Sequence, residues 1–209
     1  MTQIKYKLTD QNLRTYKGFQ WVVGEWVQAP GELDQSLCSD AWIHFYDDPL
    51  LAVFFNPIHA DIDNPRLWEM EIDGDTKMDA TKGGARRARL VRELPLSLIT
   101  PTQRVEIGIR CVQGLHSEPN FVIWAENWLN GTNRTKTAAA QAAWRAKESA
   151  AGAWRAWEAR ALAAEAAALA ARPADAAAVM WAAWAAKAVK EAEAHQVLNI
   201  LAVIKQVVG

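Results

Sequence analysis

Alanine dominates the sequence from residue 133 onward, and this change of composition constrains the fold more than any other feature. Between residues 138 and 171 the only helix-disfavouring residue is Gly152, so we predict one helix of roughly 50 Å at ~1.5 Å per residue. Pro173 breaks that helix, and a second helix is predicted from about residue 174 to 208. The simplest arrangement of the two is an antiparallel hairpin.

Aromatic residues are placed regularly along this alanine-rich part. Trp154 with Trp157, and Trp181 with Trp184, stand three residues apart and would fill the space that alanine leaves open. An Ala-rich helix buries little apolar area by itself, so we expect these helices to pack on the first domain or on other copies in a homo-oligomer. Residues 197–208 are apolar on nearly all sides, which predicts a buried helix that docks in the same way.

The first 132 residues have a varied composition and predict an α+β domain of short strands and turns, followed by the helical region 133–209. Alternation is clearest over residues 67–73, where Trp68, Met70 and Ile72 share one face and acidic residues share the other. Further strands are predicted over residues 19–23, 41–46 and 88–94, with a Gly-Gly turn at residues 83–84.

Helix signals follow within the same region. Asp48 and Pro49 predict a helix start that continues through residue 55, and Thr100 to Gln103 form a capping box. Residues 105–111 also alternate, so a strand is the second possibility there. A helix is predicted after residues 117–119, with one apolar face and an end at residues 130–131. That face consists of Phe121, Trp124, Ala125 and Trp128.

Composition and charge exclude several classes of function. Apolar residues make up 51% of the chain, enough for a sizeable core, and the net charge of -1 argues against binding to duplex nucleic acid or to a membrane. Residues 1–132 hold 13 Lys and Arg against 18 Asp and Glu, whereas residues 133–209 hold 10 against 6. We find no secretion signal and no run of about 18 strongly apolar residues, so a cytoplasmic location is expected.

Cysteine and histidine usage predicts no metal site and no cofactor. Cys38 and Cys111 lack the spacing of metal ligands and are expected to be reduced and buried. His44 and His59 are candidates for a general base or a ligand contact, with a structural histidine bonded to nearby backbone as the alternative. No nucleophile motif is present, so no residue is predicted to be catalytic.

The segment at residues 77–92 is the strongest candidate for ligand binding. It places two lysines, two adjacent glycines and four arginines within sixteen residues, a composition that can offer N–H groups to phosphate. It lacks the spacing of a P-loop. The alternative is a solvated basic turn that pairs with the acidic residues nearby. The predicted ligand-binding residues are Lys82, Arg86, Arg87, Arg89 and Arg92, together with His44 and Trp42.

A spaced pattern of glycine, aromatic and charged residues covers the first part of the chain. It consists of Gly18-Phe19-Gln20, Gly24, Cys38, Trp42, His44, Pro49-Leu50, Arg66, Glu69, Glu71, Gly74, Lys82 and Arg92-Glu93. This pattern resembles an uncharacterised family of small bacteriophage and prophage proteins, and the resemblance extends over about residues 4–130. Members similar to this chain carry variable Ala-rich tails with regularly placed aromatic residues.

The resemblance implies a small accessory protein encoded by a phage, and such proteins often counter host defence. We therefore expect an oligomeric binding protein that sequesters a small nucleotide-type immune signal in the host cytoplasm. One alternative is an inhibitor that binds a host protein through the helical region. Another is an enzyme, either one acting on a nucleotide or a degraded relative of ADP-ribosyl transferases, with His44 and Glu93 as its candidate residues.

Overall fold

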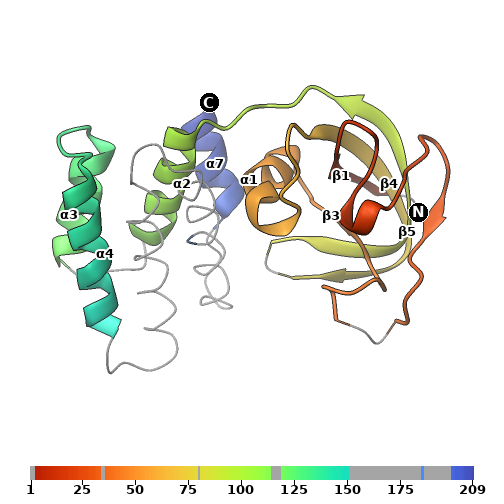
Figure 1. Cartoon of the computed structure of the whole chain (residues 1–209), viewed down its shortest axis with the longest axis horizontal. Coiled ribbons are helices and arrows are strands. Elements are labelled where there is room, and N and C mark those ends of the chain that lie inside the picture. The colour runs from red at the N-terminus through yellow and green to blue at the C-terminus, as the bar shows by residue number, and fades with distance from the viewer. Residues whose placement is uncertain (1–2, 34–35, 80, 114–118, 151–184, 186–198) are drawn as a thin grey trace. The chain divides into compact units, whose positions relative to one another are not determined.

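The computed structural model describes residues 3–33, 36–79, 81–113, 119–150, 185 and 199–209. The chain divides into two compact units, Met1–Leu98 (unit 1) and Ile99–Gly209 (unit 2). Figure 1 shows strands only in unit 1, whereas the described parts of unit 2 are helical. This boundary differs from the one predicted near residue 132, because the helices that precede the alanine-rich part pack with helices that lie within it.

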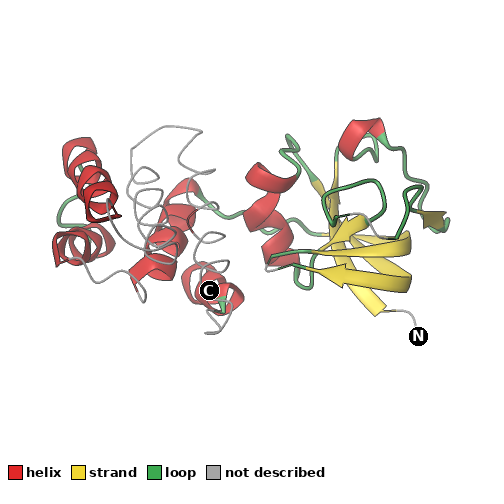
Figure 2. Ribbon diagram, turned by 90° about the horizontal axis from the view of Figure 1, so that it is seen from below, coloured by secondary structure: helices red, strands yellow, loops and turns green. Residues whose placement is uncertain are grey.

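Unit 1 is built on a five-stranded antiparallel sheet, which confirms the mixed α+β class (Figure 2). Its path is β1-β4-β5-β2, and β3 also pairs with β5. The strands are β1 (Gln3–Thr9), β2 (Val27–Gln28), β3 (Ile43–Phe45), β4 (Arg66–Met78) and β5 (Gly83–Leu94).

The sheet closes on itself. Tyr6 of β1 and Tyr46, which follows β3, exchange two backbone hydrogen bonds of 2.9 Å, so β1, β4, β5 and β3 form a ring. This ring of strands encloses a core. The buried residues of this core are Trp21, Phe45, Trp68, Met70, Ile72, Ala85, Ala88 and Leu90.

The strand predicted over residues 67–73 is confirmed and is longer than expected. Trp68, Met70 and Ile72 are buried, as their alternation predicts. Leu67 lies on the opposite face and is also buried, because it stands directly across from Leu8 of β1. The strand predicted over residues 41–46 is confirmed only for Ile43–Phe45 (β3), and the strand predicted over residues 88–94 is part of β5.

Two predictions in this unit are wrong. Residues 19–23 form no strand, since only Gln20 makes an isolated bridge and the Trp21 N–H donates to the Leu13 carbonyl across a loop. Gly83 and Gly84 lie inside β5 rather than in a turn. The sheet needs glycine there because a Cβ at Gly83 would meet the Phe45 ring at 2.3 Å.

Five helices of the described residues follow the sequence signals closely. They are α1 (Pro49–His59), α2 (Pro101–Gln113), α3 (Pro119–Leu129), α4 (Lys136–Ala150) and α7 (Ile200–Val208), and a short 3-10 turn spans Tyr16–Gly18. Asp48 caps α1 by accepting from the Leu50 N–H, as predicted. The capping box of α2 is confirmed because Thr100 Oγ1 accepts from the Gln103 N–H at 3.2 Å, so the strand alternative for residues 105–111 is wrong.

The predicted apolar face of α3 is confirmed, since all four of its residues are buried. The helix predicted to run from residue 174 to 208 is interrupted, because Asn199 has non-helical backbone angles and its side chain caps α7. α7 packs against α2 and buries Ile200 and Ile204 while Lys205 is exposed, so it is amphipathic rather than buried all round.

The predicted hairpin break at Pro173 and the paired tryptophans at residues 154, 157, 181 and 184 lie outside the described residues. Within the described part of the chain, no helix combines the length and apolar character that a membrane span requires.

Candidate anion-binding site

Three of the predicted ligand-binding residues form a cross-strand ladder of ion pairs. On β5 and β4, Arg87 pairs with Asp73 at 3.4 Å, Arg89 with Glu71 at 2.6 Å and Arg92 with Glu69 at 2.7 Å. Directly opposed residues on antiparallel strands share a face, so the alternation of both strands aligns these charges. Each of the three arginines therefore already has a carboxylate partner, as the basic-turn alternative predicted.

Two further predicted residues shape a loop that covers β5. The Arg86 guanidinium donates to the carbonyl oxygens of Ala41 and Ala29 and lies 6.0 Å from the Trp42 ring centre. Trp42 is only 8% exposed and packs with Leu37 and Ala41. A buried indole leaves no open face on which a nucleotide base could stack.

The two remaining predicted residues, Lys82 and His44, lie together beneath the same loop. We call the group formed by Lys7, Cys38, His44, Asp79 and Lys82 the Lys82 cluster. Lys82 is 8% exposed, and its ammonium lies 3.4 Å from Cys38 Sγ. A thiol sulfur is a weak acceptor, so this contact satisfies little of the hydrogen-bonding capacity of an ammonium.

Asp79 fixes the backbone that presents Lys82. Its Oδ1 accepts from the N–H groups of Thr81 at 2.6 Å and Lys82 at 2.8 Å, and also from the Thr81 hydroxyl. These bonds form an Asx-type turn between β4 and β5. Hydrogen bonds from the backbone keep the pKa of Asp79 below its usual value even though burial opposes this, so Asp79 is a carboxylate at neutral pH.

His44 is positioned by β3, where it stands directly opposite Gly84. A Cβ at Gly84 would meet Leu37 at 2.6 Å, so glycine allows the covering loop to approach the strand. His44 Nε2 lies 2.5 Å from the Leu37 carbonyl oxygen. A carbonyl only accepts, so Nε2 carries the proton. Burial, followed by the nearby Lys82 and Lys7, lowers the pKa of His44 to about 4, and the ring is neutral at pH 7.

Lys7 adds a second cation at the seam where β1 meets β3. It stands opposite Trp68 and therefore faces the core, with its ammonium donating to the His44 carbonyl at 2.8 Å and lying 5.6 Å from the Trp21 ring centre. Burial and the charge of Lys82 lower the pKa of Lys7 to about 8.

The Lys82 cluster thus has an excess of positive charge. Two ammonium groups face one carboxylate and one neutral imidazole, and within the described residues neither lysine forms a salt bridge. A buried charge without a partner is costly, and an anion would offset that cost. The charges of the cluster therefore favour a small anion over a neutral or cationic ligand.

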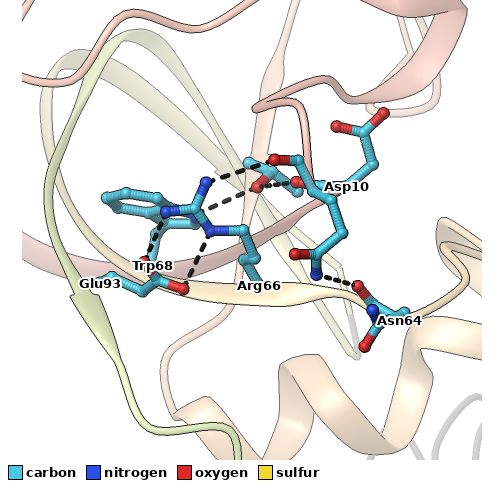
Figure 3. Close-up of polar contacts among 7 residues, drawn as sticks. Asp10, Asn64, Arg66, Trp68 and Glu93 are labelled. Carbon is cyan, nitrogen blue, oxygen red and sulfur yellow. Dashed lines mark hydrogen bonds and ion pairs between the residues drawn. The ribbon is translucent and has the colours of Figure 1, made fainter.

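A second polar network, at the other end of β5, contrasts with this cluster (Figure 3). Arg66 donates to both carboxylate oxygens of Glu93, at 2.9 and 2.5 Å, and its guanidinium lies 4.9 Å from the Trp68 ring centre. The Trp68 indole N–H in turn donates to the buried Thr9 hydroxyl at 3.0 Å. Figure 3 shows these groups turned toward one another, so the network ties three strands together and its charges are matched.

The residues of the enzyme hypothesis are not brought together. Gly84, the partner of His44, is nine residues along β5 from Glu93, which is roughly 30 Å at ~3.3 Å per residue. His59 Nδ1 lies 2.9 Å from the Tyr46 hydroxyl, and its ring lies 5.3 Å from that of Phe55. Within the described residues, no three His, Cys, Asp or Glu side chains gather in a way that could hold a metal ion.

Sequence reasoning missed Lys7, Cys38 and Asp79 as members of one cluster. Lys5 and Lys7 alternate along β1 in the pattern of a solvated strand face, and no local signal shows that this face turns inward. Cys38 was expected to be buried but is exposed, whereas Cys111 is buried as predicted. The contact between Cys38 and Lys82 spans 44 residues of sequence, so spacing alone could not indicate it.

Comparisons with known proteins bear on unit 1 alone. Residues 3–100 match a family described as a domain of unknown function (DUF7666). The matched segment covers nearly all of unit 1 and extends two residues beyond it. Comparisons with curated proteins and with solved structures found no match.

Proposed function

We propose that unit 1 is a binding module that sequesters a small phosphorylated ligand of the nucleotide type at the Lys82 cluster. The observation that carries the proposal is the buried ammonium of Lys82, whose described partner is a thiol rather than a carboxylate. Lysine is a common phosphate binder because it contributes a compact charge with three donors.

The charge balance around the cluster supports an anion rather than a neutral ligand. Lys7 reinforces the potential of Lys82, as the lowering of the Lys7 pKa by that neighbour indicates. The ladder arginines add little to the positive potential at the cluster, because each is already paired with a carboxylate. Specificity for an anion therefore comes from two lysines that the fold leaves without ion-pair partners among the described residues.

The wider setting of this proposal comes from the sequence. We propose that the protein acts against bacterial defence during phage infection, in the host cytoplasm, by withholding a nucleotide immune signal. The Ala- and Trp-rich region would form a helical hairpin that joins copies of the chain into an oligomer. An oligomer with one site per copy would raise the number of signal molecules that each assembly removes.

A heat-release assay tests sequestration. The purified full chain is incubated with a panel of nucleotide signals, and free ligand is measured before and after heat denaturation. Loss of free signal before heating, with intact recovery afterwards, is the expected result. Loss without recovery would instead indicate cleavage and favour the enzyme hypothesis.

A protein target is the second candidate function, and one observation favours it. Trp144 of α4 is 59% exposed and Ile123 of α3 is 57% exposed, although large apolar side chains are usually covered. Tryptophan is enriched among the residues that dominate protein interfaces. If no nucleotide is lost in the assay, Trp144→Ala becomes the variant with which to test inhibition of a host protein.

A further inference from the structure

The His44 ring offers a hydrogen-bond acceptor beside the two lysines. The Leu37 carbonyl fixes the proton on Nε2, so Nδ1 carries a lone pair and no hydrogen. Within the described residues no group donates to Nδ1. A ligand in the Lys82 cluster can therefore donate a hydrogen bond to His44 while its charge is balanced by lysine.

We infer that the Lys82 cluster recognises phosphate through a protonated oxygen, with Lys82 binding the anionic oxygens and His44 Nδ1 accepting from the P–OH group. This inference rests on the proposed function and narrows its ligand class. Hydrogen phosphate and a monoprotonated phosphate monoester provide both features. Sulfate and phosphodiesters carry charge but no proton on the anionic group near neutral pH, so they would leave the acceptor unpaired.

The charged groups around His44 keep this acceptor available over a broad pH range. The groups whose charges act on the ring are Lys82, Lys7 and Asp79, and burial together with the two lysines outweighs the carboxylate. The ring stays neutral above about pH 4, and Lys7 stays charged below about pH 8. A monoester acquires its proton near pH ~6, so its affinity should rise as the pH falls from 7 toward 5.

Leaving a buried polar group without its partner is what makes such sites selective. A site built to bond a hydroxyl rejects analogues that lack it far more strongly than an apolar pocket rejects a missing methylene. Hydrogen phosphate and sulfate are both dianions of similar size at pH 8, so the proton is the main difference between them. We expect hydrogen phosphate to bind more tightly than sulfate by about 10- to 100-fold.

The test titrates the full chain with inorganic phosphate and with sulfate at pH 7.5 and constant ionic strength, with wild-type protein and His44→Phe. Wild type should prefer phosphate, and His44→Phe should lose the preference while it still binds sulfate. Equal affinity of the wild type for both anions would overturn this inference but leave the proposed function standing. Binding of neither anion would overturn both. The wild-type comparison decides the matter even if His44→Phe does not fold.

Discussion

At the scale of single residues, the protein separates paired charges from unpaired ones. The arginines on β5 have carboxylates directly opposite them, whereas Lys82 and Lys7 are left with a thiol, a carbonyl and an aromatic face. Because the two lysines are at least partly buried, the lack of an ion-pair partner is costly for them, whereas a solvated lysine needs no partner. The chemical character of unit 1 therefore depends on a few side chains rather than on its overall charge.

The two cysteines should differ sharply in reactivity. Cys38 is exposed, while Cys111 is buried and burial raises its pKa to about 12. Thiolates are the reactive species, so iodoacetamide should modify one thiol per folded chain at pH 8. Mass spectrometry should place the label on Cys38, and Cys38→Ser should abolish it. Rapid labelling of Cys111 in folded protein would contradict the packing of α2.

A phosphate-type ligand should also slow this labelling. Cys38 Sγ lies 3.4 Å from the Lys82 ammonium, so an anion bound there would crowd the thiol. We expect at least a several-fold slower reaction of Cys38 at saturating ligand, with sodium chloride at equal ionic strength as the control. An unchanged rate in the presence of a ligand that binds would place that ligand elsewhere.

The free energy of unfolding should rise with pH in two separate pH ranges. Folding lowers the pKa of Lys7 from 10.5 to about 8, so between these values the unfolded chain binds more protons and stability rises with pH. Folding lowers the pKa of His44 from 6.5 to about 4, so stability falls as the pH drops from 6.5 toward 4. Chemical denaturation of wild type and Lys7→Met tests the first window, in which only the wild type should become more stable.

The affinity for an anion should fall above pH 8, although the stability of the ligand-free protein rises there. Loss of the proton from Lys7 stabilises the ligand-free fold but removes a cation from the cluster, so affinity should fall as stability rises. A titrating charge far from the cluster could change stability with pH, but it would not lower the anion affinity over the same pH range. Affinity that stays constant from pH 7 to 10 would show that Lys7 does not contribute.

At the scale of secondary structure, β5 performs two tasks along its length. From Arg87 onward it carries the ion-pair ladder, and at its start it has two glycines against which side chains from other segments pack closely. Gly84 admits Leu37 and Trp42, and with them the loop that covers Lys82. The site therefore depends on the absence of side chains at the start of the strand.

Gly84→Ala should loosen the loop that covers Lys82. The new methyl would lie 2.6 Å from Leu37 and 2.7 Å from Trp42 Cβ, which demands a shift of the loop and should cost about 1–3 kcal/mol. Gly83→Ala is the matched control, since its methyl meets Phe45 of the core and the exposed Met78 instead. Both variants should lower the free energy of unfolding, but only Gly84→Ala should speed Cys38 alkylation. Equal labelling rates would refute this role of Gly84.

The ladder should contribute modestly to stability. A double-mutant cycle with Glu71→Gln and Arg89→Gln should give a coupling of about 0.5–1 kcal/mol that falls at high salt. The cycle for Asp73 and Arg87 should give almost none, because this pair is longer at 3.4 Å and more exposed. Coupling above about 3 kcal/mol for either pair would not fit side chains this close to solvent.

Local sequence patterns predicted those elements whose cause is local. The alternation of Trp68, Met70 and Ile72, and the Thr100 capping box, depend on neighbours within a few residues, and both are confirmed. The Gly83-Gly84 pair resembles a turn in sequence because most of the side chains that require glycine there, those of Leu37, Trp42 and Phe45, lie 38 to 47 residues away. Local pattern carries no information on such contacts.

The candidate site was predictable only in part. Lys82 and His44 were selected from residue type and from a basic segment, and the structure brings them together. Lys7 was missed because ring closure through Tyr6 and Tyr46 decides which face of β1 turns inward. The arginines were selected for the same reason as Lys82, but the strand register gives them partners that the sequence does not reveal.

At the scale of the whole molecule, two boundaries differ. The composition changes near residue 132, whereas the structure divides into two units near residue 98. Unit 1 has the match to a known domain and contains the Lys82 cluster, whereas α2 and α3 belong with the helices that follow. A net charge of -1 conceals this organisation because the ladder cancels most of the basic charge on β5. The proposed anion site therefore depends on Lys82 and its neighbours in unit 1.

The most direct test compares the affinity of one phosphate-type ligand for three forms of the full chain. These are wild type, Lys82→Met and Arg87→Met, measured by isothermal titration at pH 7. A charge-assisted hydrogen bond contributes ~1.5–3 kcal/mol, so Lys82→Met should weaken binding about 10- to 100-fold while Arg87→Met changes it little. A large loss of affinity in Arg87→Met with none in Lys82→Met would contradict this prediction and would place the ligand at the arginine ladder.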